Sequence, residues 1–397
     1  MTATPAAAPR TWSLTEASCR LDDFVAVVEQ RTDLHDYPHA DRVVDNVLVY
    51  DSARLRVEIA TDEGRDGVQA ELVRALTDGP GLVVLEAAFD DLSVVDRATD
   101  VFNDMIADQK ARGATAGDHF AKPGANDRVW NGLEKLAVRD PGVFVDYYAN
   151  DVLALIFTAW LGPSYQVTSQ INVVNPGGAA QSPHRDYHLG FMTNERAAAF
   201  PAHVHTLSPV LTLQGAVAHS DMPVASGPTM YLPHSQKYVP GYLTWRRPEF
   251  IAYFDQHLVQ LPLSKGDAAF FNPALFHGAG HNRSADIKRM ANLLQVSSAF
   301  GRAMEVIDRQ KVANTIFPAL FDRKVAGASS ESLLNAVAAG AEGYSFPTNL
   351  DRDQPVDGLA PETQAELVWR ALQEGWDPST LADELADYAT RRRTDDV

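Results

Sequence analysis

The feature that most constrains the fold is a change of hydrophobic period in the second half of the chain. Between residues 165 and 300, short apolar segments alternate with a period of two and are separated by Gly, Pro, Asn and Asp. This pattern predicts β-strands joined by turns, because successive side chains of a strand point to opposite faces. The segments are YQVTSQINVVN, VLTLQGAVAHS, TMYLP, LVQLPL, DAAFF and MANLLQVSSAF. Since most of them have no helical pattern between them, we expect an antiparallel barrel or jelly roll rather than a parallel α/β sheet.

The segments before this region alternate between strand and helix patterns. Residues 46–60 predict one or two strands, and residues 82–89 predict a buried strand. Apolar residues at helical spacing predict helices over 66–81 and 150–163, each ended by a Gly-Pro pair. Ser93, with an acidic residue three positions later, predicts the N-cap of a further helix. These elements are expected to support the barrel.

The chain is expected to have three parts. Residues 1–42 are rich in Ala and Pro and then polar, which predicts a loosely packed N-terminal arm. Residues 43–304 carry the strands and their supporting helices, and residues 305–397 return to helical patterns. The helices expected in this extension are SSESLLNAVAAG, APETQAELVWRALQEG and DPSTLADELADYATRRR, the last with Asp377 as N-cap. The expected fold class is therefore mainly β with flanking helices (α+β).

Composition restricts the classes of function. The 397 residues carry a net charge of −18, which argues against binding nucleic acid or an anionic membrane over a broad face. No apolar run is long enough to cross a bilayer, and the first residues lack the pattern of a secretory signal. Cys19 is the only cysteine, which excludes an internal disulfide and a Cys-rich metal site. We therefore expect a cytoplasmic protein in which any metal is held by His and carboxylate groups.

A His-x-Asp triplet on a strand is the pattern that best fits such a metal site. Two His and one carboxylate can hold one face of an octahedral Fe(II), and side chains two apart on a strand point the same way. The chain has three such triplets: His39-Ala40-Asp41, His184-Arg185-Asp186 and His219-Ser220-Asp221. The first precedes the strand-rich region, and the third runs directly into a tight connection to the next strand. We therefore favour His184 and Asp186.

The third ligand is expected far along the chain, on a neighbouring strand. His277 and His281 are the candidates, and His277 is favoured because the small residues after it permit close approach of a ligand. Arg289 lies twelve residues beyond His277, and Lys288 eleven. A cation at this distance can bind the far carboxylate of a dicarboxylate co-substrate. Arg289 and Lys288 both remain candidates for this role, because a shift of one residue along a strand moves a side chain to the opposite face.

These residues carry a family resemblance. The segments SPHRDYHLGF, VASGPTMYLPHSQKY and LSKGDAAFFNPALFHGAGHNRSADIKR follow one another in this order. They resemble the phytanoyl-CoA dioxygenase family of Fe(II)/2-oxoglutarate oxygenases, mainly over residues 165–300. The resemblance implies a double-stranded β-helix, that is, a jelly-roll core.

The resemblance also implies roles for individual residues. The implied iron ligands are His184, Asp186 and His277. Arg289 is the implied 2-oxoglutarate anchor, although family members commonly have Arg where Lys288 stands, so the role could fall to Lys288. The other residues expected to face 2-oxoglutarate are Gln214, Thr229 and Asn172.

The activity implied by the resemblance is oxidation of a substrate with Fe(II), 2-oxoglutarate and O2, releasing succinate and CO2. Hydroxylation of an unactivated C–H bond of a small organic molecule is the expected reaction. His188, His281 and Trp130 are candidates for the substrate pocket, Trp130 within a long loop over 113–132 that has the character of a lid. Two alternatives are a cupin-like metal enzyme that does not use 2-oxoglutarate and a non-catalytic barrel used for binding. The sequence leaves the oligomeric state open.

Overall fold

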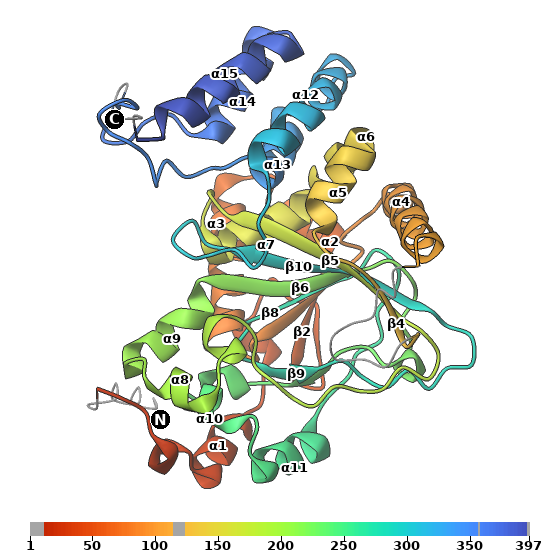
Figure 1. The fold of residues 1–397 in the computed structure, drawn as a ribbon. Helices are drawn as coiled ribbons and strands as arrows, with labels where there is room; N and C mark the ends of the chain where they lie inside the picture. The colour runs from red at the N-terminus through yellow and green to blue at the C-terminus, as the bar shows by residue number, and fades with distance from the viewer. Residues whose placement is uncertain (1–11, 114–123, 356–357, 395–397) are drawn as a thin grey trace.

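The computed structural model describes residues 12–113, 124–355 and 358–394. Within these ranges the strands form an eight-stranded sheet, in the order β1-β2-β3-β8-β6-β10-β5-β4, and a two-stranded sheet of β7 and β9 (Figure 1). Neighbouring strands are antiparallel except for β2 and β3, which are parallel. The strands are β1 (Arg42–Val44), β2 (Val47–Asp51), β3 (Leu82–Glu86), β4 (Asn126–Val129), β5 (Gln166–Val174), β6 (Thr212–Ala218), β7 (Met230–Leu232), β8 (Ala268–Phe271), β9 (Phe276–Gly278) and β10 (Arg289–Ser297).

Helices cover both outer faces of this two-sheet arrangement. In Figure 1, α2 to α7 and the C-terminal helices α12 to α15 lie on the side of the large sheet, and α1 and α8 to α11 lie on the opposite side. The helices are α1 (Leu21–Val28), α2 (Ser52–Glu58), α3 (Asp62–Thr77), α4 (Leu92–Ala111), α5 (Gly132–Arg139), α6 (Pro141–Tyr148), α7 (Asp151–Leu161), α8 (Asn194–Ala198), α9 (Ala202–Val210), α10 (Gly241–Thr244), α11 (Pro248–His257), α12 (Arg309–Val325), α13 (Ser330–Gly340), α14 (Gln364–Glu374) and α15 (Pro378–Arg391). Short 3-10 turns lie between them, including His188–Phe191.

The alternation of side chains gives the large sheet two different faces. On β10, Met290, Leu294 and Val296 pack into the core beneath the covering helices. The residues that alternate with them, including Arg289 and Gln295, point to the other face and line a cavity inside the barrel. Both faces are buried. The period of two in the sequence reflects an apolar outer face and a partly polar inner face.

The small sheet closes the barrel opposite the large one. Strand β7 pairs with β9, and single bridges join His184 to His277 and Tyr231 to Val259. Phe276 on the outer face of β9 packs against Phe24 of α1, with ring centroids 5.1 Å apart. The architecture is a jelly-roll core with flanking helices, which confirms the predicted fold class.

The expectation of a loosely packed N-terminal arm is wrong for the described part of residues 12–42. Phe24 is fully buried and contacts Tyr238, Phe250 and Phe276. The outer face of the small sheet is apolar and needs a cover, and α1 supplies it. Six of the eight residues of α1 (LDDFVAVV) are apolar, but the composition of residues 1–42 as a whole conceals this short pattern.

Two predictions for the segments before the barrel, the strands over 46–60 and the N-cap at Ser93, are wrong because aspartate caps start helices there. Residues 46–60 form one strand, β2, and then turn into α2, because the Asp51 carboxylate accepts the Ala53 N–H at 2.9 Å and starts a helix. The cap of α4 is Asp91, which accepts the Ser93 N–H at 2.9 Å, and not Ser93. In both places an aspartate two residues before the bonded N–H initiates the helix.

Two segments of the barrel region also differ from expectation. The segment 113–132 was expected to be a loop, but Asn126–Val129 form β4 and pair with β5; His119 and Phe120, further lid candidates, lie outside the described residues. LVQLPL forms no strand and contributes only the single bridges of Val259 and Leu263. Its proline and the isolated pairing leave no continuous ladder.

The C-terminal extension contains the three expected helices as α13, α14 and α15, with Asp377 capping α15. Helix α12 was not expected, and Pro318 in its interior interrupts the usual helix signal. Among the described residues, no helix is both long and apolar enough to cross a membrane.

Candidate active site

Three side chains converge where the two sheets face one another. His184, Asp186 and His277 each offer a ligand atom within 4.8 Å of the others. The backbones of His184 and His277 hydrogen-bond each other in both directions, at 2.9 and 3.2 Å. This bridge brings together two segments that are far apart in the sequence. Among the described residues, no other group of His, Cys, Asp and Glu has the geometry of a metal site.

Hydrogen bonds orient both imidazole rings for metal binding. The Nδ1 of His184 lies 3.0 Å from the Ser182 carbonyl oxygen, and the Nδ1 of His277 lies 2.9 Å from that of Leu275. A carbonyl can only accept, so Nδ1 carries the proton in each ring and Nε2 presents its lone pair. The Nε2 atoms of His184 and His277 lie 3.6 and 3.3 Å from the Asp186 carboxylate. The donor set and ring orientation therefore fit Fe(II).

The carboxylate of Asp186 is held in its ionised form. Burial would raise the pKa of Asp186, but the electrostatic interactions with the nearby imidazoles of His184 and His277, together with hydrogen bonds, hold it well below its usual range. The Gln214 Nε2 donates to Asp186 Oδ2 at 2.5 Å. Burial also lowers the pKa of His184, which favours the neutral ring that a metal requires.

The other two His-x-Asp triplets are engaged elsewhere. His39 Nδ1 lies 2.6 Å from the Glu58 carboxylate at the edge of the large core. His219 is buried with both ring nitrogens occupied, at 2.8 Å from Thr99 Oγ1 and 2.9 Å from the Tyr147 hydroxyl. Neither ring has a nitrogen pointing to a shared ligand site, so both are structural.

The buried His219 predicts a specific dependence of stability on pH. Burial lowers the pKa of His219 to about 3 from 6.5, so between these values the unfolded state binds a proton that the folded state does not. The free energy of unfolding therefore falls as pH falls through this window, by about 1.4 kcal/mol per pH unit from this group. We expect His219→Gln to show a correspondingly shallower slope in urea unfolding between pH 6 and 4.5. The exposed His203, replaced in His203→Gln, should leave the slope unchanged; an equal slope in H219Q would contradict the assignment.

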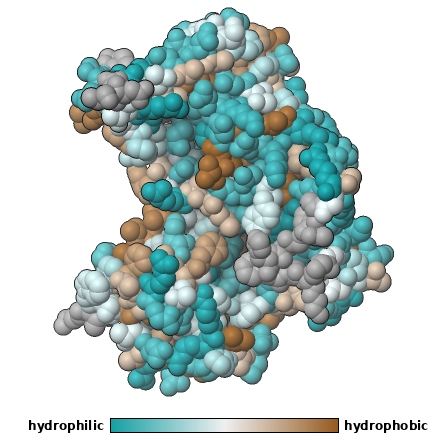
Figure 2. Space-filling model, viewed as in Figure 1, coloured by the Kyte–Doolittle hydropathy of each residue, from teal (hydrophilic) through white to brown (hydrophobic). Residues whose placement is uncertain are grey.

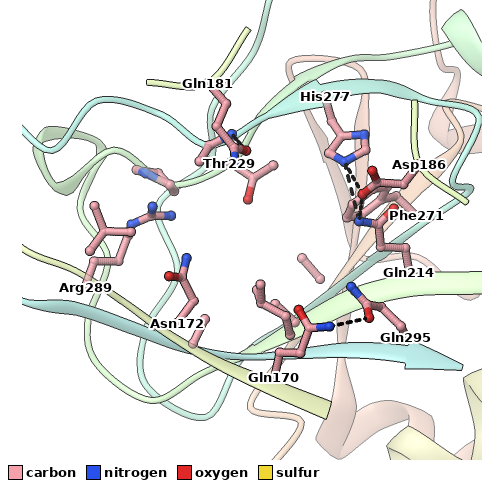
Figure 3. Close-up of a pocket in the computed structure, with 18 of the residues that line it drawn as sticks. Gln170, Asn172, Gln181, Asp186, Gln214, Thr229, Phe271, His277, Arg289 and Gln295 are labelled. Atoms are coloured by element: carbon pink, nitrogen blue, oxygen red, sulfur yellow. Dashed lines mark hydrogen bonds and ion pairs between the residues drawn. The ribbon is translucent and has the colours of Figure 1, made fainter. Parts of the chain in front are cut away.

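A buried arginine lies across the cavity from the triad. Figure 3 shows Arg289 on the opposite side from His277 and Asp186, with Asn172 and Thr229 between them. Arg289 is 6% exposed, and its Nε and Nη2 have no hydrogen-bond partner among the described residues. Burial lowers the pKa of Arg289 to about 10, so the guanidinium stays charged at neutral pH. Lys288 is exposed, because it lies on the opposite side of the chain just before β10.

The other residues predicted to face 2-oxoglutarate all line the cavity, but they do not have the same neighbours. Asn172, Thr229 and Gln214 line the cavity, but Gln214 contacts the metal-binding side chains Asp186 and His277. Trp130 also lines the cavity, at the end of β4.

Two substrate-pocket candidates do not lie where they were expected. His188 does not line the cavity, because the backbone turns at Tyr187 and His188, both with positive φ, and directs its Nδ1 toward Ser208 Oγ at 3.4 Å. His281 is exposed in the turn after β9 and likewise lies outside the lining.

Arg185, between the two expected ligands, was not recognised from the sequence. Its guanidinium is buried behind the triad, where it donates to the backbone carbonyls of Ser235 and Tyr238 at 2.6 and 2.9 Å. Gly241 packs against it, and a Cβ there would lie 1.9 Å from Arg185 Cζ. The arginine therefore anchors the His184–Asp186 segment to the layer behind it. An Arg between two ligands on an alternating strand faces away from the metal, and this is the signal that could have indicated its role.

A jelly roll with two His and one Asp at its centre, and a buried Arg across the cavity, defines the class of Fe(II)/2-oxoglutarate-dependent enzymes. The family model described as phytanoyl-CoA dioxygenase (PhyH) matches residues 64–290, which is more than half of the chain. The chain therefore belongs to the phytanoyl-CoA dioxygenase family. The match begins well before the motif region, so the supporting helices are part of the family's domain. The predicted cofactors, Fe(II) with 2-oxoglutarate and O2, are confirmed by this membership and the triad.

Solved structures that match this chain have low sequence identity and low TM-scores. The crystal structure of AviO1 from Streptomyces viridochromogenes Tue57 is 18% identical, with a TM-score of 0.42 over 59% of this chain and 96% of that chain. The non-heme alpha-ketoglutarate-dependent epimerase SnoN from nogalamycin biosynthesis is 16% identical, with a TM-score of 0.38 over 60% of this chain and 82% of that chain. The structure of SnoN in complex with Fe3+, alpha ketoglutarate and nogalamycin RO is 16% identical, with a TM-score of 0.37 over 60% of this chain and 85% of that chain. The comparison with curated proteins gives no match.

Proposed function

We propose that this protein hydroxylates an unactivated C–H bond of a small organic substrate, with release of succinate and CO2. The observation that carries the proposal is the pairing of the His184–Asp186–His277 cluster with Arg289 across one cavity. The cluster supplies a metal site with free positions. Arg289 supplies a buried charge whose Nε and Nη2 have no hydrogen-bond partner among the described residues. An enzyme that did not use 2-oxoglutarate would leave Arg289 without a role. A cytoplasmic location agrees with the single cysteine.

In this proposal, His184, Asp186 and His277 hold the iron, and Gln214 holds the Asp186 carboxylate in place. Bound Fe(II) and 2-oxoglutarate would together supply the electrons that reduce and thereby activate O2. The chain's own contribution is placement. Arg289 binds the carboxylate of 2-oxoglutarate that lies far from the metal, and Asn172 and Thr229 contact the co-substrate between the two ends.

The inner face of the barrel also limits access of water. Val84, Ala269 and Phe271 line the cavity beside the triad, and Phe271 packs against His277 with ring centroids 4.6 Å apart. An apolar wall around a charged site strengthens its electrostatic interactions and protects reactive species from side reactions.

Anaerobic addition of Fe(II) and then 2-oxoglutarate tests the proposal without knowledge of the substrate. We expect a visible metal-to-ligand charge-transfer band that needs both additions, and succinate release once O2 is admitted. Succinate in place of 2-oxoglutarate is the control and should give no band. A protein that binds Fe(II) but shows no spectral change with 2-oxoglutarate would refute the proposal.

A further inference from the structure

Two glutamine side chains lie side by side on the inner wall of the barrel, at the end of β10 away from Arg289. Gln170 is 1% exposed and Gln295 is 6% exposed, and both line the cavity. Gln295 is paired in register with Gln214, which contacts Asp186 and His277. It is six residues from Arg289 on the same strand, a separation of about 20 Å. Gln295 therefore lies next to the metal site and far from the proposed anchor of 2-oxoglutarate.

A chain of hydrogen bonds fixes the orientation of both amides. Arg128 Nη1 donates to Gln170 Oε1 at 3.2 Å, and arginine has no acceptor, so the oxygen of Gln170 faces Arg128. Gln170 Nε2 then donates to Gln295 Oε1 at 3.2 Å and to Met304 Sδ at 3.4 Å. The Oε1 of Gln295 thus accepts a hydrogen bond from Gln170, and the Nε2 of Gln295 points into the cavity (Figure 3). Within the described part of the chain, this nitrogen has no hydrogen-bond partner.

Part of the wall near this nitrogen is apolar. Trp130, Phe191 and Met304 line the same part of the cavity, and Tyr187 donates to Met304 Sδ at 3.3 Å, which fixes the thioether in the wall. The Gln295 Nε2 is open to the cavity, so a bound molecule that excludes water from it gains by supplying an acceptor. Arg128 is a cation in the same lining, and its guanidinium is held by Gln170 and lies over the Trp130 ring at 4.9 Å.

We propose that the Gln295 amide is the group that positions the substrate, by donating a hydrogen bond to a carbonyl or hydroxyl oxygen. The substrate is then an oxygenated molecule with an apolar frame that packs against Trp130, Phe191 and Met304. Gln170 is a positioning residue that acts through Gln295. The inference rests on the proposed function, since it takes the region between Gln295 and the triad as the place of reaction.

Three probes with one carbon frame test this inference: 1-tetralone, 1-tetralol and tetralin. Each is titrated by calorimetry into protein loaded anaerobically with Fe(II) and 2-oxoglutarate. We expect the ketone and the alcohol to bind about three- to tenfold more tightly than the hydrocarbon, the contribution of one net hydrogen bond. In Gln295→Leu the three dissociation constants should agree within about twofold. In Gln295→Glu, which accepts but does not donate, the alcohol should keep its advantage and the ketone should lose it.

Gln256→Leu makes the same chemical change on the exposed side of α11 and should keep the wild-type order of affinities. Equal binding of the three probes by the wild type, or a preference for the ketone that persists in Gln295→Leu, would overturn the inference. The charge-transfer band separates this result from failure of the proposed function. A normal band with no preference among the probes rejects only the role of Gln295, whereas absence of the band in the wild type rejects both.

Discussion

Replacing Asp186 with alanine is expected to lower the affinity for Fe(II) by more than about a hundredfold and to abolish turnover of 2-oxoglutarate. Loss of a residue that only supports a metal ligand already costs about 10- to 100-fold, so loss of the one carboxylate ligand should cost more. The variant would also leave two imidazole nitrogens facing each other without the anion between them. Metal content after anaerobic loading and dialysis, together with succinate release, measures the effect.

The matched control is Asp221→Ala, in the third His-x-Asp triplet. Asp221 is exposed and accepts the Lys265 N–H at 2.9 Å, away from the cavity. This variant should bind Fe(II) and release succinate like the wild type. Retention of stoichiometric iron in Asp186→Ala would show that the triad is not the metal site.

Replacing Arg289 with glutamine is expected to raise the dissociation constant of 2-oxoglutarate by at least about 30-fold, because a buried carboxylate loses its cation. The fold should not weaken. Arg289 makes no hydrogen bond through Nε or Nη2, so removal of its desolvated charge breaks no bond at these atoms. Titration of the charge-transfer band gives the dissociation constant, and thermal unfolding of the metal-free protein shows whether the fold is intact.

Lys288→Gln is the control for charge removal at the neighbouring position. Lys288 is exposed, and we expect its replacement to change the dissociation constant of 2-oxoglutarate by less than about twofold, as for a solvated surface charge. If Lys288→Gln weakened binding and Arg289→Gln did not, the assignment of the anchor would have to be reversed.

Much of the barrel and its centre was predictable from the sequence. The period of two between residues 165 and 300 predicted most of the strands, because an apolar outer face and a partly polar inner face alternate along each strand. The order of the motifs around His184, Asp186 and His277 predicted which side chains meet. The polar inner face could also have been found, since Arg289 and Gln295 have the same parity on β10. The cover supplied by α1 was harder to predict, because a helix of eight residues gives only a short pattern and the surface it covers is distant in the sequence. Helix α12 was missed because Pro318 interrupts its pattern.

The sequence by itself therefore determined the kind of fold and a short set of possible ligands. It could not choose between Arg289 and Lys288, because the face of a strand depends on register, and register is set by the partner strand. It placed His188 and His281 near the substrate, whereas a backbone turn and an exposed loop direct them elsewhere. Only the tertiary structure brought Met304, beyond the last strand, beside Gln170 and left the Gln295 amide open to the cavity. Such contacts join residues more than a hundred positions apart, and local pattern carries no information about them.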